Sequence, residues 1–269
     1  MDLKLKNKVL IITGGYEGIG EGITRLALDE GAIPVFAGRN KKAGESFLNE
    51  LKRQNKESHF VEVELGTKEN CKKVVDETLQ RFGRIDALIN NAGTNDSIGL
   101  ESGGPDKFLQ SLCNNLYHYY FLAHYALDAL KNSRGSIVNI SSKTAITGQG
   151  NTSGYAAAKG AQLALTREWA VELLPYGIRV NAVIPAEVMT PQYERWINKF
   201  PNPDEKLLEI TENIPLGNRM TTKEEIASMV IYLVSDQASH ITGHIFMWMA
   251  DMFILTGLWL EIIIRFYRL

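Results

Sequence analysis

A tyrosine and a lysine four residues apart stand in the alanine-rich stretch GYAAAKGA, residues 154–161. Alanine favours helix, and residues four apart share one helix face, so we expect Lys159 to lie beside Tyr155. A nearby ammonium favours the phenolate and should lower the tyrosine pKa from about 10. Tyr155 would then serve as a general acid or base closer to neutral pH. The pair therefore predicts a proton-transfer unit.

A hydroxyl group precedes this pair. Ser142 ends the apolar stretch IVNISS and could hold a substrate oxygen while Tyr155 moves the proton. A tyrosine and lysine at this spacing are frequent by chance on helix surfaces. Here the pair follows TGGYEGIG (13–20), NNAG (90–93) and NISS (139–142), in that order. This combination favours a catalytic pair over two side chains that merely share a helix surface.

The glycines of TGGYEGIG follow a predicted strand and open a predicted helix. They fall at 14, 18 and 20, in the spacing TGxxxGxG. Glycine lets the backbone approach a pyrophosphate, and the amino end of a helix favours anions. This context predicts a dinucleotide site and not merely a tight turn.

The end of the second predicted strand should select the nucleotide. A carboxylate there would bind the ribose 2′-hydroxyl of NAD, but this chain has Gly38, Arg39 and Asn40. Arg39 suits the 2′-phosphate of NADP, which we prefer over NAD, although a solvated loop charge is the alternative reading. Glu64, after the third strand, could accept from the adenine amino group.

The elements that must position these groups alternate along the chain. The 269 residues, 45% of them hydrophobic, suffice for one large core. The predicted strands cover residues 8–13, 32–38, 59–65, 86–93, 135–142, 178–185 and 244–248. The predicted helices cover residues 18–30, 41–53, 71–82, 108–130, 154–174 and 222–235. This alternation predicts an α/β fold: a single Rossmann-type doubly wound parallel seven-stranded sheet with helices on both faces.

One long segment lacks a regular pattern. Residues 186–220 are rich in Pro, Asn and charge, and we interpret them as a lid. The beginning of the chain runs into a strand without the apolar run of a secretory signal, so we expect a cytoplasmic protein.

Composition excludes other classes of site. The net charge of −2 comes without a basic block, which argues against nucleic-acid binding. Cys71 and Cys113 have no metal-ligand spacing and are expected to be buried free thiols. The histidines lack paired ligands, so we predict no metal site.

These motifs together resemble the short-chain dehydrogenases/reductases of the classical type, over residues 5–246. The resemblance assigns a catalytic set to Asn115, Ser142, Tyr155 and Lys159. It implies that Asn115 holds a water linking Lys159 to bulk solvent, that Lys159 also bonds the nicotinamide ribose, and that the protein is a homo-oligomer, commonly a tetramer. The residues expected to bind the cofactor are Thr13, Gly14, Gly18, Ile19, Gly20, Arg39, Glu64, Leu65, Asn91, Ala92, Gly93, Tyr155, Lys159, Pro185, Val188 and Thr190. Ala186 stands where the family has a glycine, and Thr190 is expected at the carboxamide.

Longer stretches resemble the L-fucose dehydrogenase-like branch of the family, which implies a sugar or other polyhydroxy alcohol as substrate. The candidate substrate residues suit one: the polar Asn95, Asp96, Gln149, Asn151 and Glu187, with Tyr193 and Trp196 able to stack on a ring. The alternative reading is that the two acids are solvated loop charges and the two aromatic residues pack the lid. His118 is read as a packed helix residue.

Two other functions stay open at this stage. One is a 3-oxoacyl or ketosteroid-type carbonyl reductase, whose pocket should be more apolar. The other is a non-catalytic nucleotide-binding protein, or an enzyme inactivated by an altered end of the chain.

Residues 247–269 depart from the family. Instead of an aspartate–glycine–glycine turn, the chain reads MWMADMFILTGLW onward. Permitted codons for this stretch, read in another frame, encode Val-Asp-Gly-Gly-Tyr, so we hypothesise a frameshift near Phe246. A membrane anchor is the rival, but Asp251 and Glu261 make it costly. A surface helix is the third alternative.

Overall fold

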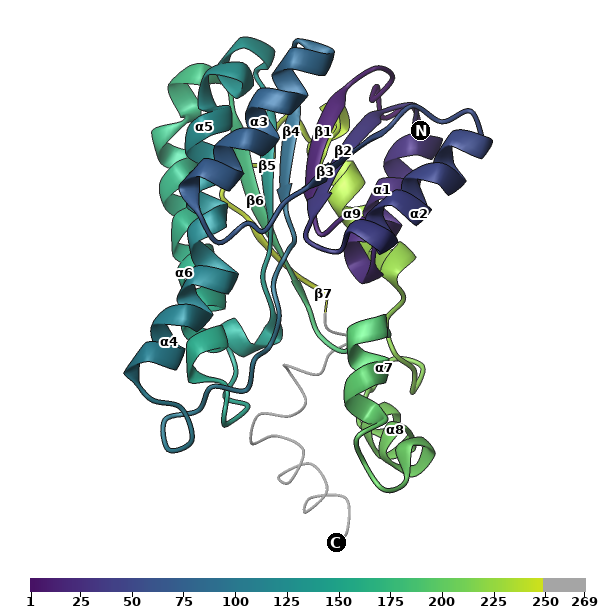
Figure 1. Ribbon diagram of the computed structural model, residues 1–269, viewed down its shortest axis with the longest axis vertical. Helices are drawn as coiled ribbons and strands as arrows, with labels where there is room; N and C mark the ends of the chain where they lie inside the picture. Colours follow the sequence, from purple (N-terminus) through teal and green to yellow (C-terminus); the bar gives the residue numbers. More distant parts are fainter. Residues whose placement is uncertain (249–269) are drawn as a thin grey trace, which may run out of the picture.

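Seven parallel strands form one sheet in the computed structural model, which describes residues 1–248 (Figure 1). Their order is β3-β2-β1-β4-β5-β6-β7, so the chain reverses direction across the sheet between β1 and β4. Such a reversal opens a crevice at the carboxyl ends of the strands. The strands are β1 (Val9–Thr13), β2 (Ile33–Gly38), β3 (His59–Glu62), β4 (Ala87–Asn90), β5 (Ser136–Ile140), β6 (Arg179–Pro185) and β7 (Ile245–Trp248). The predicted fold class is confirmed.

Helices cover both faces of this sheet (Figure 1). On one face lie α1 (Gly18–Asp29), α2 (Lys41–Arg53) and α9 (Lys223–Val234). On the other lie α3 (Lys68–Phe82), α5 (His118–Ser133) and α6 (Ser153–Glu172). Below the sheet, α4 (Pro105–Leu112) packs on α6, and α7 (Pro191–Ile197) lies near α8 (Pro203–Glu212).

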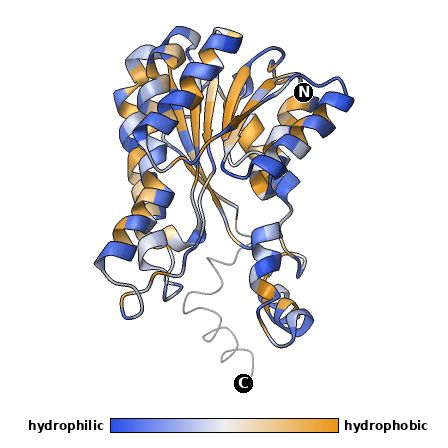
Figure 2. Ribbon diagram, in the orientation of Figure 1, coloured by the Kyte–Doolittle hydropathy of each residue, from blue (hydrophilic) through white to orange (hydrophobic). Residues whose placement is uncertain are grey.

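The central strands are apolar because both of their faces are covered. All five residues of β1 are buried. Val9 and Ile11 join the core on the α3 and α5 side, whereas Leu10 and Ile12 join the core on the α1 and α9 side. Figure 2 shows the strands as an apolar layer between amphipathic helices. This double burial explains the continuous hydrophobic runs in the sequence.

The predicted helix over 108–130 differs from the observed structure. The chain is helical from Pro105 to Ser133, but α4 and α5 are joined by a π-helical segment, Cys113–Tyr117. Asn115 lies within this segment, and its Nδ2 donates to the Ser111 carbonyl. π-Helical turns are often found at functional sites.

The segment predicted to be irregular, 186–220, contains the helices α7 and α8. Each begins with a proline, which is favoured in the first helical turn, so the richness in proline did not exclude helices here. Trp196 packs its ring edge-on against Tyr193 and Phe200, with centroids 5.2 and 5.0 Å away. The segment is therefore ordered by its own aromatic contacts.

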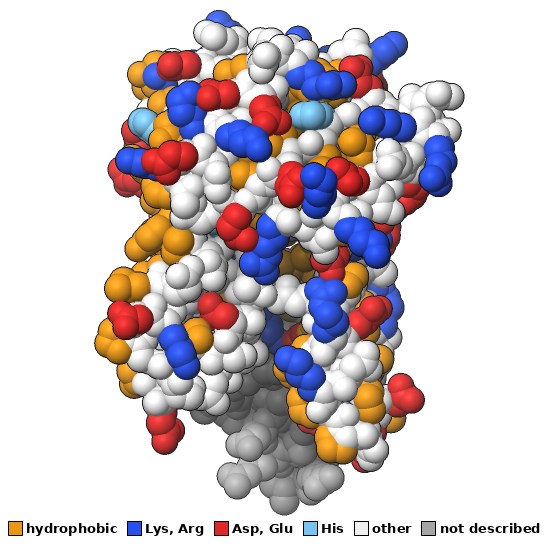
Figure 3. All heavy atoms as spheres, viewed as in Figure 1, with side chains coloured by type: hydrophobic (Ala, Val, Ile, Leu, Met, Phe, Trp, Pro, Cys, Tyr) orange, Lys and Arg blue, Asp and Glu red, His pale blue; other side chains and the backbone are white. Residues whose placement is uncertain are grey.

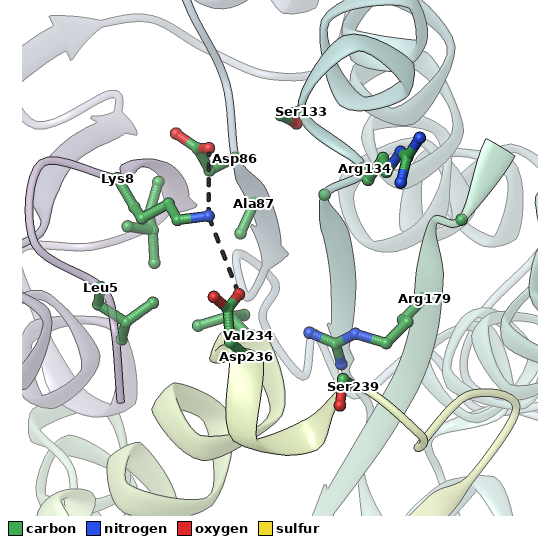
Figure 4. Close-up of a pocket in the computed structure, with 13 residues that line it drawn as sticks. Leu5, Lys8, Asp86, Ala87, Ser133, Arg134, Arg179, Val234, Asp236 and Ser239 are labelled. Atoms are coloured by element: carbon green, nitrogen blue, oxygen red, sulfur yellow. Dashed lines mark ion pairs between the residues drawn. The ribbon is translucent and has the colours of Figure 1, made fainter. Parts of the chain in front are cut away.

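A small cavity of about 160 Å³ lies at the amino ends of the strands, opposite the crevice (Figure 4). Lys8 Nζ lies 3.9 Å from carboxylate oxygens of both Asp86 and Asp236. The Arg179 guanidinium donates to the main-chain carbonyls of Leu233 and Ser235 at the end of α9. These charged groups are partnered within the protein, and they tie β1, β4 and β6 to the end of α9.

The two cysteines lie in different environments. Cys71 is fully buried, and burial raises the pKa of its thiol to about 12. Cys113 is only partly buried, contrary to the prediction, and its thiol donates to the Gly66 carbonyl at 3.2 Å.

Within residues 1–248, no helix has the length and apolar character needed to cross a membrane. In the same range, no three His, Cys, Asp or Glu side chains are grouped as metal ligands. The atypical segment 247–269 lies outside the described residues except for Met247 and Trp248, which pair with β6.

Candidate active site

A cleft of about 1130 Å³ lies at the carboxyl ends of the strands. Figure 3 shows it as a recess between the lobe that contains α4 and the lobe of α7 and α8. The cleft lies where the strand order reverses, which is the usual position of a ligand in such sheets. Fourteen of the predicted cofactor residues line it, namely Gly14, Gly18, Ile19, Arg39, Glu64, Leu65, Asn91, Ala92, Gly93, Tyr155, Lys159, Pro185, Val188 and Thr190.

The glycine loop has room for backbone contacts only. A Cβ on Gly20 would lie 2.2 Å from the Gly14 carbonyl oxygen, and Gly14 itself has a φ of +65°. Helix α1 begins at Gly18. Its N-cap residue is Glu17, whose side chain accepts no hydrogen bond from the first N–H groups of the helix. Free N–H groups at a helix amino end attract anions. The loop therefore fits the pyrophosphate of a dinucleotide.

Thr13 acts behind this loop and does not line the cleft. Its Oγ1 accepts from the main-chain N–H groups of Asn91 and Ala92 at 2.8 and 2.9 Å. The Asn91 amide donates in turn to the Thr13 carbonyl at 2.8 Å. Thr13 thus joins β1 to the turn after β4 across the point where the strand order reverses.

The adenosine end of the cleft is shaped by Tyr16, which the sequence analysis did not single out. Its ring lies directly over Gly38, where a Cβ would approach it to 2.4 Å. Its hydroxyl accepts from the Asn40 N–H at 3.1 Å. Arg39 is exposed and lies 3.5 Å from Glu64. An acidic side chain at position 38 would have to displace the Tyr16 ring. The packing of Tyr16 therefore explains why this strand ends in glycine and not in an acid.

Ser142, Tyr155 and Lys159 meet in the cleft. The Ser142 hydroxyl faces the Tyr155 phenol and opposes the rise of its pKa, whereas the nearby Asp96 charge adds to the rise. Lys159 Nζ lies 5.5 Å from the centre of the Tyr155 ring. The three side chains are close enough to share one reactive centre.

The predicted lowering of the tyrosine pKa is wrong for this structure. Burial raises the pKa of Tyr155 to about 12 and lowers the pKa of Lys159 to about 7. Desolvation disfavours the charged form of each group, and the ammonium points to other partners. Tyr155 is therefore a neutral phenol near pH 7, ready to donate a proton.

Asn115 is fully buried behind Lys159 and does not line the cleft. Its Oδ1 accepts from the Thr94 N–H at 2.7 Å. Its carbonyl accepts from Gln162 Nε2 at 2.7 Å. Asn115 thus fixes the turn after β4. The hydrogen bond from Gln162 uses one of the two lone pairs of the Asn115 carbonyl oxygen.

The segment 186–220, predicted to be a lid, meets the phosphate end of the cleft at Thr190. This residue is the N-cap of α7, its side chain accepting from the Tyr193 N–H at 3.2 Å. A Cβ on Gly18 would lie 3.3 Å from the Thr190 side chain. A second contact joins Arg195 to Glu17 at 2.8 Å. The start of α7 and the glycine loop therefore form adjacent walls of the cleft.

The predicted substrate residues gather at the other end. Asn95, Gln149, Asn151, Glu187, Tyr193 and Trp196 all line the cleft. Asp96 does not line it, although its charge acts on Tyr155 and its buried Oδ1 has no hydrogen-bond partner among the described residues. His118 is buried as predicted, but it also lines the cleft, and its Nε2 lies 3.1 Å from the Ala92 carbonyl oxygen.

Lys143 is a cleft residue that the sequence analysis missed. Its ammonium forms an ion pair with Glu187, and the two side chains are 25% and 12% exposed. Lys143 directly follows Ser142, so its position beside the proposed catalytic hydroxyl could have drawn attention. Its partner is 44 residues away along the chain, which no local pattern indicates.

Comparison with known proteins agrees with this geometry. The model of the family described as enoyl-(acyl carrier protein) reductase matches residues 14–249. L-fucose dehydrogenase of Bos taurus is 35% identical over 244 residues, which cover 90% of this chain and 88% of the relative.

Two solved structures are similar over almost their whole length. The crystal structure of Cj0485 dehydrogenase has a TM-score of 0.88 and 48% identity, covering 94% of this chain and 96% of the other. Ligand-free aldohexose dehydrogenase of Thermoplasma acidophilum has a TM-score of 0.85 and 29% identity, covering 94% and 97%. Fold, cleft and relatives together show that the chain belongs to the short-chain dehydrogenase/reductase family of NAD(P)-dependent oxidoreductases.

Proposed function

We propose that the protein is an NADP(H)-linked dehydrogenase acting on a sugar such as L-fucose. The observation that carries this proposal is the charged and polar substrate end of the cleft, with the Lys143–Glu187 ion pair beside Ser142. The sugar-dehydrogenase names of two relatives support it.

Proton transfer falls to Tyr155. In oxidation the substrate hydroxyl would lie between Ser142 and Tyr155, with Ser142 holding its oxygen and Tyr155, as phenolate, accepting its proton. In reduction the neutral phenol donates that proton to the carbonyl oxygen. Lys159, one helical turn away, supplies a positive charge near the phenolate. When bound, the nicotinamide ring supplies the hydride acceptor or donor at its C4.

Hydroxyl groups on the substrate would find several partners. Asn95, Gln149 and Asn151 offer both donors and acceptors, and Glu187 offers an acceptor. Polar groups that are left unpaired in a closed site are costly, so a lining of this kind selects against an apolar ligand. Tyr193 and Trp196 provide apolar faces on the lid for one side of a sugar ring.

NADP is preferred because Gly38 carries no carboxylate and Arg39 follows it. Arg39 is 72% exposed and its ion pair with Glu64 is long, at 3.5 Å. An exposed pair contributes about 0–1 kcal/mol, so a 2′-phosphate can compete with Glu64 for the guanidinium.

A carbonyl reductase acting on acyl substrates is the second candidate, favoured by the description of the matching family model. A non-catalytic nucleotide-binding protein is the third. The approach of Ser142, Tyr155 and Lys159 in one cleft argues against the latter.

The test is an assay of the purified protein on aldoses, including L-fucose, and on 3-oxoacyl and steroid ketones, with both dinucleotides. We expect NADP-dependent oxidation of L-fucose or a close aldose, and its loss in Tyr155→Phe with the affinity for NADPH retained. Turnover of acyl or steroid ketones alone would refute the sugar assignment. Full activity of Tyr155→Phe would refute the role of the tyrosine.

A further inference from the structure

Two hydrogen bonds within the protein hold the Lys159 ammonium. Lys159 is 2% exposed, and its Nζ donates to the Ile140 carbonyl at 2.7 Å and to the Tyr119 hydroxyl at 3.2 Å. A buried ammonium needs acceptors for its N–H groups. Two of its three donors are thereby occupied, which leaves one for the side of Tyr155 and the cleft.

Tyr119 completes a closed triangle of hydrogen bonds. Its own hydroxyl donates to the Ile140 carbonyl at 3.0 Å. The side chain is fully buried, and burial raises its pKa well above 10, so it remains a neutral phenol. Its ring centre lies 5.4 Å from Lys159 Nζ, compared with 5.5 Å for the ring of Tyr155. The ammonium thus lies midway between two tyrosines, only one of which lines the cleft.

Other contacts fix the main chain around Lys159. The Ser141 hydroxyl donates to the Lys159 carbonyl at 2.9 Å. One turn further along α6, Gln162 Nε2 donates to the Asn115 carbonyl. Removing the Tyr119 hydroxyl should therefore leave α6 in place and release only the ammonium end of Lys159.

We propose that Tyr119 is a positioning residue for Lys159. The Tyr119 hydroxyl holds the Lys159 ammonium at the distance from Tyr155 that proton transfer requires. Without this hydroxyl the buried ammonium keeps only the Ile140 carbonyl as a partner. It then has more reason to lose its proton or to move from its present distance to Tyr155. Loss of the proton removes the positive charge that would support the Tyr155 phenolate.

The first test is Tyr119→Phe, which removes one oxygen and keeps the ring. The probe is an aromatic α-diketone reduced with NADPH, so that the result does not depend on the identity of the sugar. We expect kcat to fall at least tenfold, with the KM values for diketone and NADPH changed less than threefold and the thermal unfolding midpoint still well above the assay temperature. Tyr120→Phe, on the exposed side of the same helix, is the control and should retain wild-type kcat.

A double-mutant cycle separates positioning from a general structural effect. If Tyr119 acts through Lys159, then Tyr119→Phe should lower kcat no further when Lys159 is already Met. An additional fall of tenfold or more in the Lys159→Met background, or an unchanged kcat in Tyr119→Phe alone, would overturn the proposal. Should Tyr119→Phe prove unstable, the same cycle measured below its unfolding midpoint decides the matter.

Discussion

The Lys143 ammonium and the Glu187 carboxylate form an ion pair that bridges the segments following β5 and β6, beside Ser142. Both side chains are mostly buried, and burial lowers the pKa of Lys143. Within residues 1–248, this is the ion pair that joins the segment carrying Ser142, the proposed catalytic hydroxyl, to the segment leading into the predicted lid. The predicted substrate end of the cleft therefore contains two charged groups whose opposite charges cancel, so it has no net charge from this pair.

Glu187→Gln should raise the KM for L-fucose at least tenfold, because the amide is a weaker acceptor for sugar hydroxyls. The KM for NADP should change less than twofold. The single variant should also lose about 1–3 kcal/mol of stability, since a mostly buried ammonium is left unpaired. Steady-state kinetics and urea unfolding measure the two effects. The double variant Lys143→Met/Glu187→Leu should regain stability without regaining affinity for the sugar, and a double variant that regains both would contradict this role.

Arg39→Ala should weaken NADPH binding about tenfold, roughly 1.4 kcal/mol, and leave NADH binding unchanged. A change in its partner, Glu64→Gln, should have the opposite effect and strengthen NADPH binding, because it removes the competing carboxylate 3.5 Å from Arg39. Fluorescence titration measures both. Lys42→Ala on the exposed start of α2 is the matched control. Equal losses for NADPH and NADH in Arg39→Ala would show that the arginine does not select between them.

His118 should make the fold sensitive to acid. Burial lowers its pKa from 6.5 to about 4, so the unfolded chain binds more protons between these values. Stability is then fully present above pH 6.5 and falls as the pH drops toward 4, by about 3 kcal/mol at most. Urea unfolding from pH 7 to 4 should show a shallower fall in His118→Gln than in the wild type. His124→Gln, on the exposed face of the same helix, should follow the wild type.

Gly20→Ala should impair dinucleotide binding at least tenfold, since its Cβ would overlap the Gly14 carbonyl oxygen and the Asn91 amide. The glycine loop must shift to accept it. Gly160→Ala in α6 is the control, because its nearest neighbour would lie 4.0 Å away, and alanine favours helix by about 1 kcal/mol. Wild-type NADPH affinity in Gly20→Ala would show that the loop does not hold the phosphates.

Glu17→Gln should tighten NADPH binding two- to fivefold by removing a negative charge from the phosphate end of the cleft. Arg195, which lies 2.8 Å from Glu17, would be freed for the phosphates. Because both groups are exposed, the pair itself contributes at most about 1 kcal/mol to stability. Binding measured at low and high salt tests this: the gain should shrink as salt screens the charges, and a loss of affinity would refute it.

Local patterns predicted most of the architecture. The strand β1 and the start of α1 could be read from VLIIT and the glycines because burial on both faces and the need for close backbone approach leave direct marks in the sequence. The meeting of Ser142, Tyr155 and Lys159 followed from helix spacing and from the ends of parallel strands. The helices α7 and α8 were missed because a proline that starts a helix resembles one that ends it.

The electrostatics of the site could not be read in the same way. The pKa of Tyr155 depends on how far it is buried and on where Lys159 points, and the Ile140 carbonyl and Tyr119 settle the latter. These partners come from a neighbouring strand and helix. The pairs Lys143–Glu187 and Tyr16–Gly38 are likewise tertiary contacts between segments distant in sequence.

The packing of Thr190 against Gly18 has a kinetic consequence. Thr190, the N-cap of α7, lies against the loop that would bind the pyrophosphate, so the coenzyme would share a wall with the segment that we propose closes over the sugar. We expect an ordered reaction in which the dinucleotide enters first and departs last, and in which its departure, tied to the opening of that wall, sets the pace of turnover.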